Sequence, residues 1–398
     1  MHLSLVLLLL LSAATAESPA ERCIRAARAA IEAQPEEHAH HNDLALALAR
    51  RARETASGEH YEEAFQALER SRELAPDNYG ARRVEVWLLL GQHEFARALE
   101  AARELNREAP DDSMVYGFLV DACVELGLYA EAEEACQWML DLRPGAVPGL
   151  TRAAYLRELF GDPEGAAELL VSAYGMLPAS EVEDRAWVLT HLAALHLALE
   201  TPAGLALAEQ ALDQALALFP DYHYALEQQA AVRLRQGQSA EAVRLLRRRF
   251  ELAPHPENLF DLALALQRSG RAGEAAPLLV EFERSARAEM ENADNANGEL
   301  IRFYLEPEWS ALRPPGRGPA EALCIAEREV ARRGSGELRL LLARAQIANG
   351  RGAEARATAA GLLASGLRTA PVLELAAELG LDPEAAPKPG SSDATEGA

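Results

Sequence analysis

The sequence predicts an all-α protein, a right-handed superhelical solenoid of antiparallel helix pairs. Ala, Leu, Glu and Arg dominate its 398 residues, a composition typical of helical proteins. Its apolar residues fall mostly in runs with the period of an α-helix. Prolines at a fixed spacing then divide the chain into similar units, as in a repeat protein.

Six prolines mark the ends of these units. The first four are 34 residues apart, and the last two are again 34 apart after a gap of 42, which implies an eight-residue insertion: Pro76, Pro110, Pro144, Pro178, Pro220 and Pro254. An Ala precedes each proline by twelve residues: Ala64, Ala98, Ala132, Ala166, Ala208 and Ala242. A small residue there lets the two helices of a unit approach closely, and the proline ends the second helix.

Each unit contains a turn between two helical runs. Gly127, Gly161 and Gly237 lie at this turn in the clearest units, and the turn of the unit that ends at Pro110 looks longer by two residues. A single helix pair cannot bury its apolar stripe alone. Stacked pairs bury a continuous core, which gives a solenoid.

The pattern resembles the tetratricopeptide repeat family, a helix–turn–helix unit of 34 residues with small side chains at fixed positions. The match is best over Ser113–Pro144: Tyr116, Leu119, Gly127, Tyr129 and Ala132 stand at the family's fourth, seventh, fifteenth, seventeenth and twentieth positions. Val120 and Met139 are larger than the family prefers. The resemblance covers roughly residues 38–366 and is strong over 77–254. The predicted domains are tetratricopeptide-like repeats at 17–288 and degenerate helical repeats at 289–380.

The C-terminal third is predicted to be a degenerate continuation of the solenoid with a Pro-rich insertion at 289–318. Its Asn-rich start should be a loop, followed by a helix that begins near Glu299 and ends or kinks at Pro307. The stretch "RPPGRGP" should be an exposed connection. Helices are then expected at 320–333, 337–349 and 353–365, with a cap at 372–379 and a disordered tail at 381–398.

Residues 1–16 have the pattern of a secretory signal peptide. An apolar run from Leu3 to Leu11 is followed by Ala14-Thr15-Ala16, a small-residue cleavage pattern. The run is shorter than the about 20 apolar residues that a membrane-spanning helix needs. We therefore expect an exported protein, periplasmic or extracellular, with no membrane insertion after cleavage.

The chemistry-bearing motifs point away from an enzyme. The only lysine is Lys388, so the chain has no phosphate-binding Walker loop, and it has no zinc-protease or nucleophile-elbow motif and no implied cofactor. A formal net charge of -23 opposes nucleic-acid binding, which needs a basic face. Cys123 and Cys136 are expected as small core residues rather than a disulfide, because the repeat register separates them by roughly 10 Å along the helix axes.

The stretch "HAHHND" is the one metal-like cluster. His38, His40 and His41 could share a copper or zinc ion, but a polar loop that ends at an Asn42 or Asp43 helix N-cap is the favoured interpretation.

The family resemblance implies a concave surface lined by the first helices of the units, which binds a peptide or protein segment. The residues expected to face this groove are Met114, Asp121, Glu125, Thr151, Tyr155, Glu158, Tyr224, Glu227 and Arg235. Carboxylates and tyrosines predominate over cations among them. The expected partner is therefore a protein or peptide, and basic segments in it would complement these residues.

The sequence thus predicts an exported, non-enzymatic repeat scaffold that binds a protein or peptide segment. Two alternatives remain open. One is a metal-binding or enzymatic accessory protein that uses His38–His41 or residues 289–318. The other is a cytoplasmic regulatory adaptor, if the N-terminus is not cleaved.

Mass spectrometry of the protein purified from its native organism tests the export prediction. A mature chain that begins at Glu17 is expected, because signal peptidase cuts after a small-residue pattern such as Ala14-Thr15-Ala16. A chain that still begins at Met1 would support the cytoplasmic adaptor instead.

Overall fold

The computed structural model describes residues 17–385, and the chain in this range is all-α. It forms twenty α-helices and two short 3-10 helices, and no strand occurs between residues 17 and 385. The helices of the N-terminal half are α1 (Pro19–Ala33), α2 (His38–Thr55), α3 (Gly58–Leu74), α4 (Tyr79–Gly91), α5 (Phe95–Glu108), α6 (Ser113–Glu125), α7 (Tyr129–Leu142), α8 (Val147–Leu159), α9 (Pro163–Met176), α10 (Val182–Ala198) and α11 (Pro202–Leu218).

The C-terminal half continues the same alternation of helices. It contains α12 (His223–Arg235), α13 (Ser239–Leu252), α14 (Pro256–Arg268), α15 (Ala272–Ala288), α16 (Asn297–Leu305), η1 (Pro307–Leu312), α17 (Pro319–Arg332), α18 (Gly336–Ala348), α19 (Gly352–Ala364), α20 (Ala370–Glu378) and η2 (Pro383–Ala385). The predicted all-α solenoid of helix pairs is confirmed.

The alanine predicted to lie between paired helices is buried in every unit. Ala64, Ala98, Ala132, Ala166, Ala208 and Ala242 each have 0% of their surface exposed. A larger side chain at this position would have to displace the neighbouring helix, because protein interiors are packed as densely as organic crystals. The recurring alanine is therefore the residue that fixes how closely each pair packs.

The turn between the paired helices needs a residue in the left-handed region. Gly127, Gly161 and Gly237 have φ values of 72°, 83° and 74°. His93, with φ of 61°, takes the same place in the α4–α5 turn and lies 34 residues before Gly127. The prediction of a turn two residues longer in this unit is therefore wrong: histidine is among the non-glycine residues that tolerate this conformation, so the turn keeps its length.

The eight-residue insertion lengthens one helix pair rather than a loop. Both α10 and α11 have 17 residues, whereas α6 has 13 and α7 has 14. The extra turns make this pair taller than its neighbours.

The C-terminal helices lie close to their expected places. The helix expected near Glu299 begins at Asn297 and ends at Leu305, and a 3-10 helix starts at Pro307. Residues 314–316 of the "RPPGRGP" connection are exposed. Helices α17 to α20 begin and end within two residues of the ranges that the sequence predicts.

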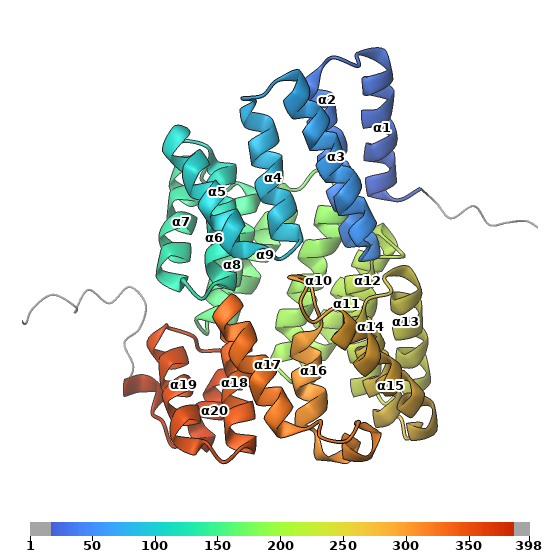
Figure 1. Ribbon diagram of the computed structural model, residues 1–398, viewed down its shortest axis with the longest axis vertical. Coiled ribbons are helices and arrows are strands. Elements are labelled where there is room, and N and C mark those ends of the chain that lie inside the picture. Colours follow the sequence, from blue (N-terminus) through green and yellow to red (C-terminus); the bar gives the residue numbers. More distant parts are fainter. Residues whose placement is uncertain (1–16, 386–398) are drawn as a thin grey trace, which may run out of the picture.

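The solenoid curls so far that its C-terminal helices α18–α20 contact the units of α6–α8, a feature that the sequence pattern does not predict. In Figure 1, α1–α7 occupy the upper part of the molecule and α13–α20 the lower part. Tyr129 at the start of α7 accepts a hydrogen bond of 2.7 Å from the backbone N–H of Gly336 at the start of α18. The backbone N–H of Arg368 donates a bond of 2.8 Å to the carbonyl of Leu159 at the end of α8.

This contact between α6–α8 and the C-terminal helices requires glycine in two of the turns. A Cβ atom on Gly127 would collide with the carbonyl oxygen of Gly334, and one on Gly161 would lie 2.7 Å from the Cβ of Arg368. One hydrophobic cluster accordingly joins residues of α6–α8, such as Leu156, to residues of α18–α20, such as Leu362 and Leu375.

The cysteines of the central unit are part of this core. Cys123 and Cys136 are buried and unbonded, as the register predicts. Burial raises the pKa of each thiol to about 11, so both are neutral near pH 7.

The predicted signal peptide at residues 1–16 and residues 386–398 of the predicted tail lie outside the described residues. Between residues 17 and 385, no helix has both the length and the hydropathy that a membrane span requires.

Ala132→Leu should lower the free energy of unfolding by about 1–3 kcal/mol, because overpacking at a fully buried contact forces the helices apart. Urea unfolding followed by circular dichroism measures the change. The matched control is Ala130→Leu on the exposed side of the same helix, which should change the stability by less than about 0.5 kcal/mol. Equal effects of the two changes would contradict the assigned packing.

Candidate functional site

The residues predicted to face the groove lie on the first helices of three units, α6, α8 and α12. Asp121 of α6 is already paired: its carboxylate accepts hydrogen bonds of 2.8 Å and 2.5 Å from Nε and Nη2 of Arg152 on α8. Arg152 also donates to the backbone carbonyl of Gly117. The negative charge of Asp121 is therefore neutralised within the chain and is not available to a ligand.

Glu125, Tyr155 and Glu158 come together at the ends of α6 and α8. Burial raises the pKa of both carboxyl groups, and neither has a hydrogen bond or ion pair with another described residue. Burial also raises the pKa of Tyr155, and the nearby charges of Glu125 and Glu158 raise it further. Yet 41% of the surface of Tyr155 stays exposed, so this group combines an open aromatic face with two unpaired carboxyl groups.

Three of the predicted groove residues belong neither to the group of Glu125, Tyr155 and Glu158 nor to the cavity lined by Tyr224 and Glu227. Met114 lies at the start of α6 and is 45% exposed. Thr151 is buried, and its hydroxyl donates to the carbonyl of Pro148 in its own helix. Arg235, at the end of α12, donates to the backbone carbonyl of Leu197 at 2.5 Å.

Tyr224 and Glu227 line a cavity of about 320 Å³ between the end of α2 and the inner sides of α10 and α12. Its walls carry aromatic and charged side chains from all three helices, chiefly Arg53, Glu54, Glu183, Trp187, His191 and Tyr222. Most ligand sites are concave, mainly apolar and supplied with a few polar groups, and this cavity has those properties. We define it as the inner cavity.

One wall of the inner cavity is the aromatic pair of α10. The rings of Trp187 and His191 are 3.8 Å apart between centroids, and Nδ1 of His191 is 3.2 Å from the carbonyl oxygen of Trp187. Burial lowers the pKa of His191, so the imidazole is neutral at pH 7. Nδ1 then carries the proton for the carbonyl, which leaves Nε2 as an acceptor.

The opposite wall is formed by aromatic residues at the start of α12. The rings of Tyr222 and Tyr224 pack edge to face with their centroids 5.5 Å apart. The ring centroids of His223 and Tyr224 are 3.9 Å apart. Burial lowers the pKa of His223 to about 4, so its ring is neutral and its Nε2 donates a bond of 2.9 Å to the carbonyl of Arg53. This bond joins α2 to α12 across the inner face of the solenoid.

Arg53 closes one end of the inner cavity. Its Nη2 lies 2.9 Å from Oε1 of Glu183, and its guanidinium is 5.5 Å from the ring centre of Trp87. The cation is therefore held by a carboxylate on one side and an aromatic face on the other.

Glu227, which also lines the cavity, shares its one arginine with two other carboxylates. Arg249, whose side chain is 2% exposed, contacts three carboxylates: Glu227 at 2.8 Å, Glu257 at 3.6 Å and Asp261. Burial raises the pKa of Glu227 to about 7, against the opposing effect of Arg249. One arginine among three carboxylates leaves this part of the cavity short of positive charge.

The sequence analysis missed the contribution of α10, although the rule that identified Tyr224 would have found part of it. Glu183 and Thr190 occupy the second and ninth places of α10, as Tyr224 and Ala231 do in α12. The insertion in this unit obscured the register. Arg53 had no such signal, because it lies in the last turn of a longer helix and reaches the cavity only through the curl of the solenoid.

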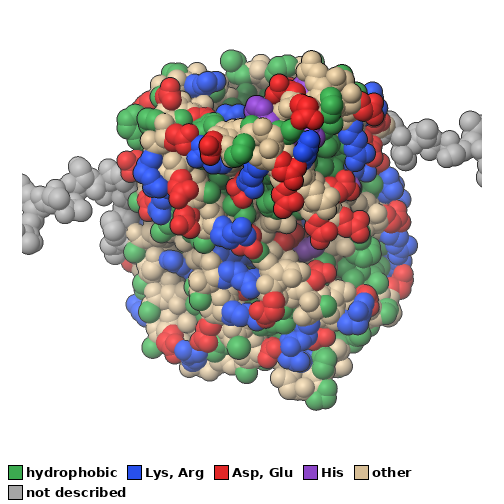
Figure 2. Space-filling model, turned by 45° about the horizontal axis from the view of Figure 1, so that its top comes forward, with side chains coloured by type: hydrophobic (Ala, Val, Ile, Leu, Met, Phe, Trp, Pro, Cys, Tyr) green, Lys and Arg blue, Asp and Glu red, His purple; other side chains and the backbone are tan. Residues whose placement is uncertain are grey.

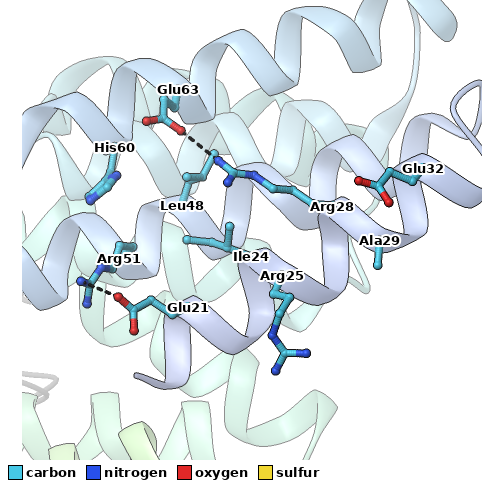
Figure 3. A pocket seen from close by; sticks show the side chains of 10 residues that line it. All are labelled: Glu21, Ile24, Arg25, Arg28, Ala29, Glu32, Leu48, Arg51, His60 and Glu63. Atoms are coloured by element: carbon cyan, nitrogen blue, oxygen red, sulfur yellow. Dashed lines mark hydrogen bonds and ion pairs between the residues drawn. The ribbon is translucent and has the colours of Figure 1, made fainter. Parts of the chain in front are cut away.

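A second and larger cavity, of about 570 Å³, lies on α1, α2 and α3. Figure 3 shows ion pairs of Arg51 and Arg28 with glutamates that also line the cavity. Arg51 lies 2.8 Å from Glu21, and Arg28 lies 3.4 Å from Glu63. None of the predicted groove residues lines it. Arginines and glutamates are equally numerous in its lining, so its charge favours neither an anionic nor a cationic ligand.

The histidine cluster is helical rather than a loop. His38, His40 and His41 lie in the first turns of α2, whose N-cap is Glu37 instead of Asn42 or Asp43. The predicted loop is therefore wrong, because Glu37 caps the helix first. His41 is nearly buried and bonds through Nε2 to the carbonyl of Pro35 at 3.3 Å. Within residues 17–385, no three His, Cys, Asp or Glu side chains are grouped to hold a metal ion.

The surface charge is mixed on the face shown in Figure 2, where arginine and carboxylate side chains are interspersed. No extended basic area of the kind that binds nucleic acid gathers on that face.

Comparison with known proteins identifies the fold. No family model matches the chain, and no curated protein sequence matches it. Among solved structures, a chain of the APC/C hetero-tetramer Cut9–Hcn1 is 15% identical with a TM-score of 0.52, over 76% of this chain and 55% of that one. The present chain thus spans about half of the length of that protein.

Two further structures are similar over larger shares of their own length. Yeast Tom70 is 14% identical with a TM-score of 0.47, over 91% of this chain and 85% of that one. A tetratricopeptide repeat protein from Parabacteroides merdae is 14% identical with a TM-score of 0.43, over 62% and 90%. The similarity to the chain of the Cut9–Hcn1 complex, with a TM-score above 0.5 at 15% identity, shows a shared fold and nothing about shared partners.

Glu227 should make the stability depend on pH. Because its folded pKa of about 7 lies above its unfolded value of 4.5, the folded state binds more protons in this range. The contribution of Glu227 to the free energy of unfolding is therefore fully present below about pH 4.5 and declines as the pH rises through 7. Urea titrations of the wild type and Glu227→Gln from pH 4 to 8 measure the difference. If the wild type instead becomes more stable relative to Glu227→Gln as the pH rises, the raised pKa of Glu227 is wrong.

Proposed function

From a tetratricopeptide-repeat-type fold as the premise, we propose that this protein is an interaction scaffold that binds a protein segment with basic residues on its inner face. It is not an enzyme, binds no nucleic acid and is exported to the periplasm or the extracellular space. The partner chemistry is that of arginine or lysine side chains on an extended or helical segment.

The observation that carries this proposal is that carboxylates of the inner face lack an ion-pair partner of their own; Arg333, whose charge acts on Glu125, lies 3.8 Å from Glu329. Glu125 and Glu158 have no ion pair with a described residue, and Glu227 shares Arg249 with two other carboxylates. Burial of an unpaired carboxylate costs free energy, which a cationic partner would recover. The nearby tyrosines Tyr155 and Tyr224, each 41% exposed, offer flat faces to the same partner.

The pairing of Asp121 with Arg152 removes Asp121 from the residues proposed to bind the partner. Reversal of Asp121 would place two cations side by side and disturb the contact between α6 and α8. The carboxylates to test are therefore Glu125 and Glu158.

A fluorescein-labelled ten-residue peptide with alternating Arg and Ala tests the proposal by fluorescence anisotropy. The peptide should bind the full chain, and the affinity should fall as salt screens the charges. Glu125→Gln combined with Glu158→Gln should weaken binding about 2- to 30-fold, since each partly exposed pair contributes about 0.2–1 kcal/mol.

The matched control changes the same number of charges elsewhere. Glu133→Gln combined with Glu134→Gln alters two exposed carboxylates on α7, and it should leave the affinity within about twofold of the wild type. The proposal is wrong if the peptide does not bind, or if both double variants weaken it equally.

A further inference from the structure

We propose that the inner cavity between α2, α10 and α12 is a subsite for one arginine side chain of the bound segment. This inference rests on the proposed function and adds which residue type is recognised and where.

The shape of the inner cavity fits a single planar side chain. Its volume of about 320 Å³ is at the lower end of ligand sites, so it accommodates one side chain rather than a folded element. Trp187 on α10 and Tyr224 on α12 line it from two helices. A flat cation between such rings gains attraction from their negatively charged faces.

The charges on the walls favour a cation. Four charged residues line the cavity, and three of them are carboxylic acids: Arg53, Glu54, Glu183 and Glu227. Arg51 lies 2.9 Å from Glu54, and Arg53 lies 2.9 Å from Glu183, so both of these carboxylates already have a partner. Glu227 also has a partner, but Arg249 is shared with two further carboxylates, Glu257 and Asp261, whereas Arg51 is shared with one, Glu21.

The position of Arg53 decides where the ligand must lie. Its guanidinium is held against Glu183 and the ring of Trp87, and it would repel a second cation placed beside it. A ligand cation is therefore expected at Glu227 rather than at Glu183. Tyr224, three residues before Glu227 on α12, is itself within the electrostatic influence of Arg53 and Arg249.

A guanidinium fits these walls better than an ammonium group. It is planar, stacks on aromatic rings and donates two parallel hydrogen bonds to one carboxylate. The protein itself uses this arrangement: Arg185 lies 4.1 Å from the ring centre of Tyr174, and Arg53 combines Trp87 with Glu183. The Nε2 acceptor of neutral His191 offers a further partner for a guanidinium N–H.

Fluorine NMR of the full chain labelled with 5-fluorotryptophan reports on this cavity directly. The protein has four tryptophans, and Trp187→Phe assigns the resonance of Trp187. Titration with the ten-residue Arg–Ala peptide should shift the Trp187 resonance, whereas the resonance of Trp138, which is 49% exposed, should not move. A peptide with citrulline, the uncharged isostere of arginine, should not shift Trp187, and a lysine peptide should bind more weakly.

Two variants of Tyr224 separate the ring from the hydroxyl. Tyr224→Ala should raise the Kd for the arginine peptide, measured from the Trp187 resonance, by about threefold or more, because the aromatic face is lost. Tyr224→Phe keeps the ring and should bind within about twofold of the wild type. Thermal unfolding of both variants shows whether the fold is intact.

The outcomes also separate this inference from the proposed function. If the arginine peptide binds in the anisotropy assay and Trp187 does not move, the subsite is wrong and the proposed function stands. An equal shift with citrulline would likewise overturn the subsite, because the charge would then be irrelevant. If N-acetyl-arginine amide shifts Trp187 and the peptide does not, the cavity takes a free small molecule and the assigned occupant is wrong.

Discussion

The close contact of paired helices at a recurring alanine is the constraint on which the rest of the structure depends. Ala132 and its five equivalents are completely buried, so no larger side chain separates each second helix from its surroundings at this position. Repetition of one geometry then fixes how each unit is rotated relative to the last. The curl of the solenoid, and everything its inner face can bind, follows from this repeated contact.

That curl brings the C-terminal helices against the units of α6–α8, and α12 against α2. The bonds from Gly336 to Tyr129 and from Arg368 to Leu159 join α17–α20 to the turns of α6–α8, and His223 binds the last turn of α2. These contacts use surface that an open solenoid would present to solvent. What remains of the inner face is smaller and better defined, which favours recognition of side chains over a broad, flat contact.

The electrostatics of the inner face follow from the same closure. Burial removes water from carboxylates without supplying each with its own cation, so the pKa values of Glu125, Glu158 and Glu227 rise together. Asp121 differs in that Arg152, one unit further along, is hydrogen-bonded to its carboxylate. The inner face thus carries paired and unpaired carboxylates, and the unpaired ones mark where a cationic partner gains most.

The sequence alone determined the repeat, because a 34-residue period with fixed Pro and Ala positions reports local packing between neighbouring units. It identified the helices and the buried Ala contacts, and it singled out Tyr224 and Glu227, which line the inner cavity. The pairing of Asp121, the place of His93 in its turn and the contribution of Arg53 and Trp187 were decided by tertiary structure. Arg53 and Trp187 line the same cavity only because the small rotations between successive units add up and bring α2 beside α10 and α12. No local sequence pattern encodes this sum.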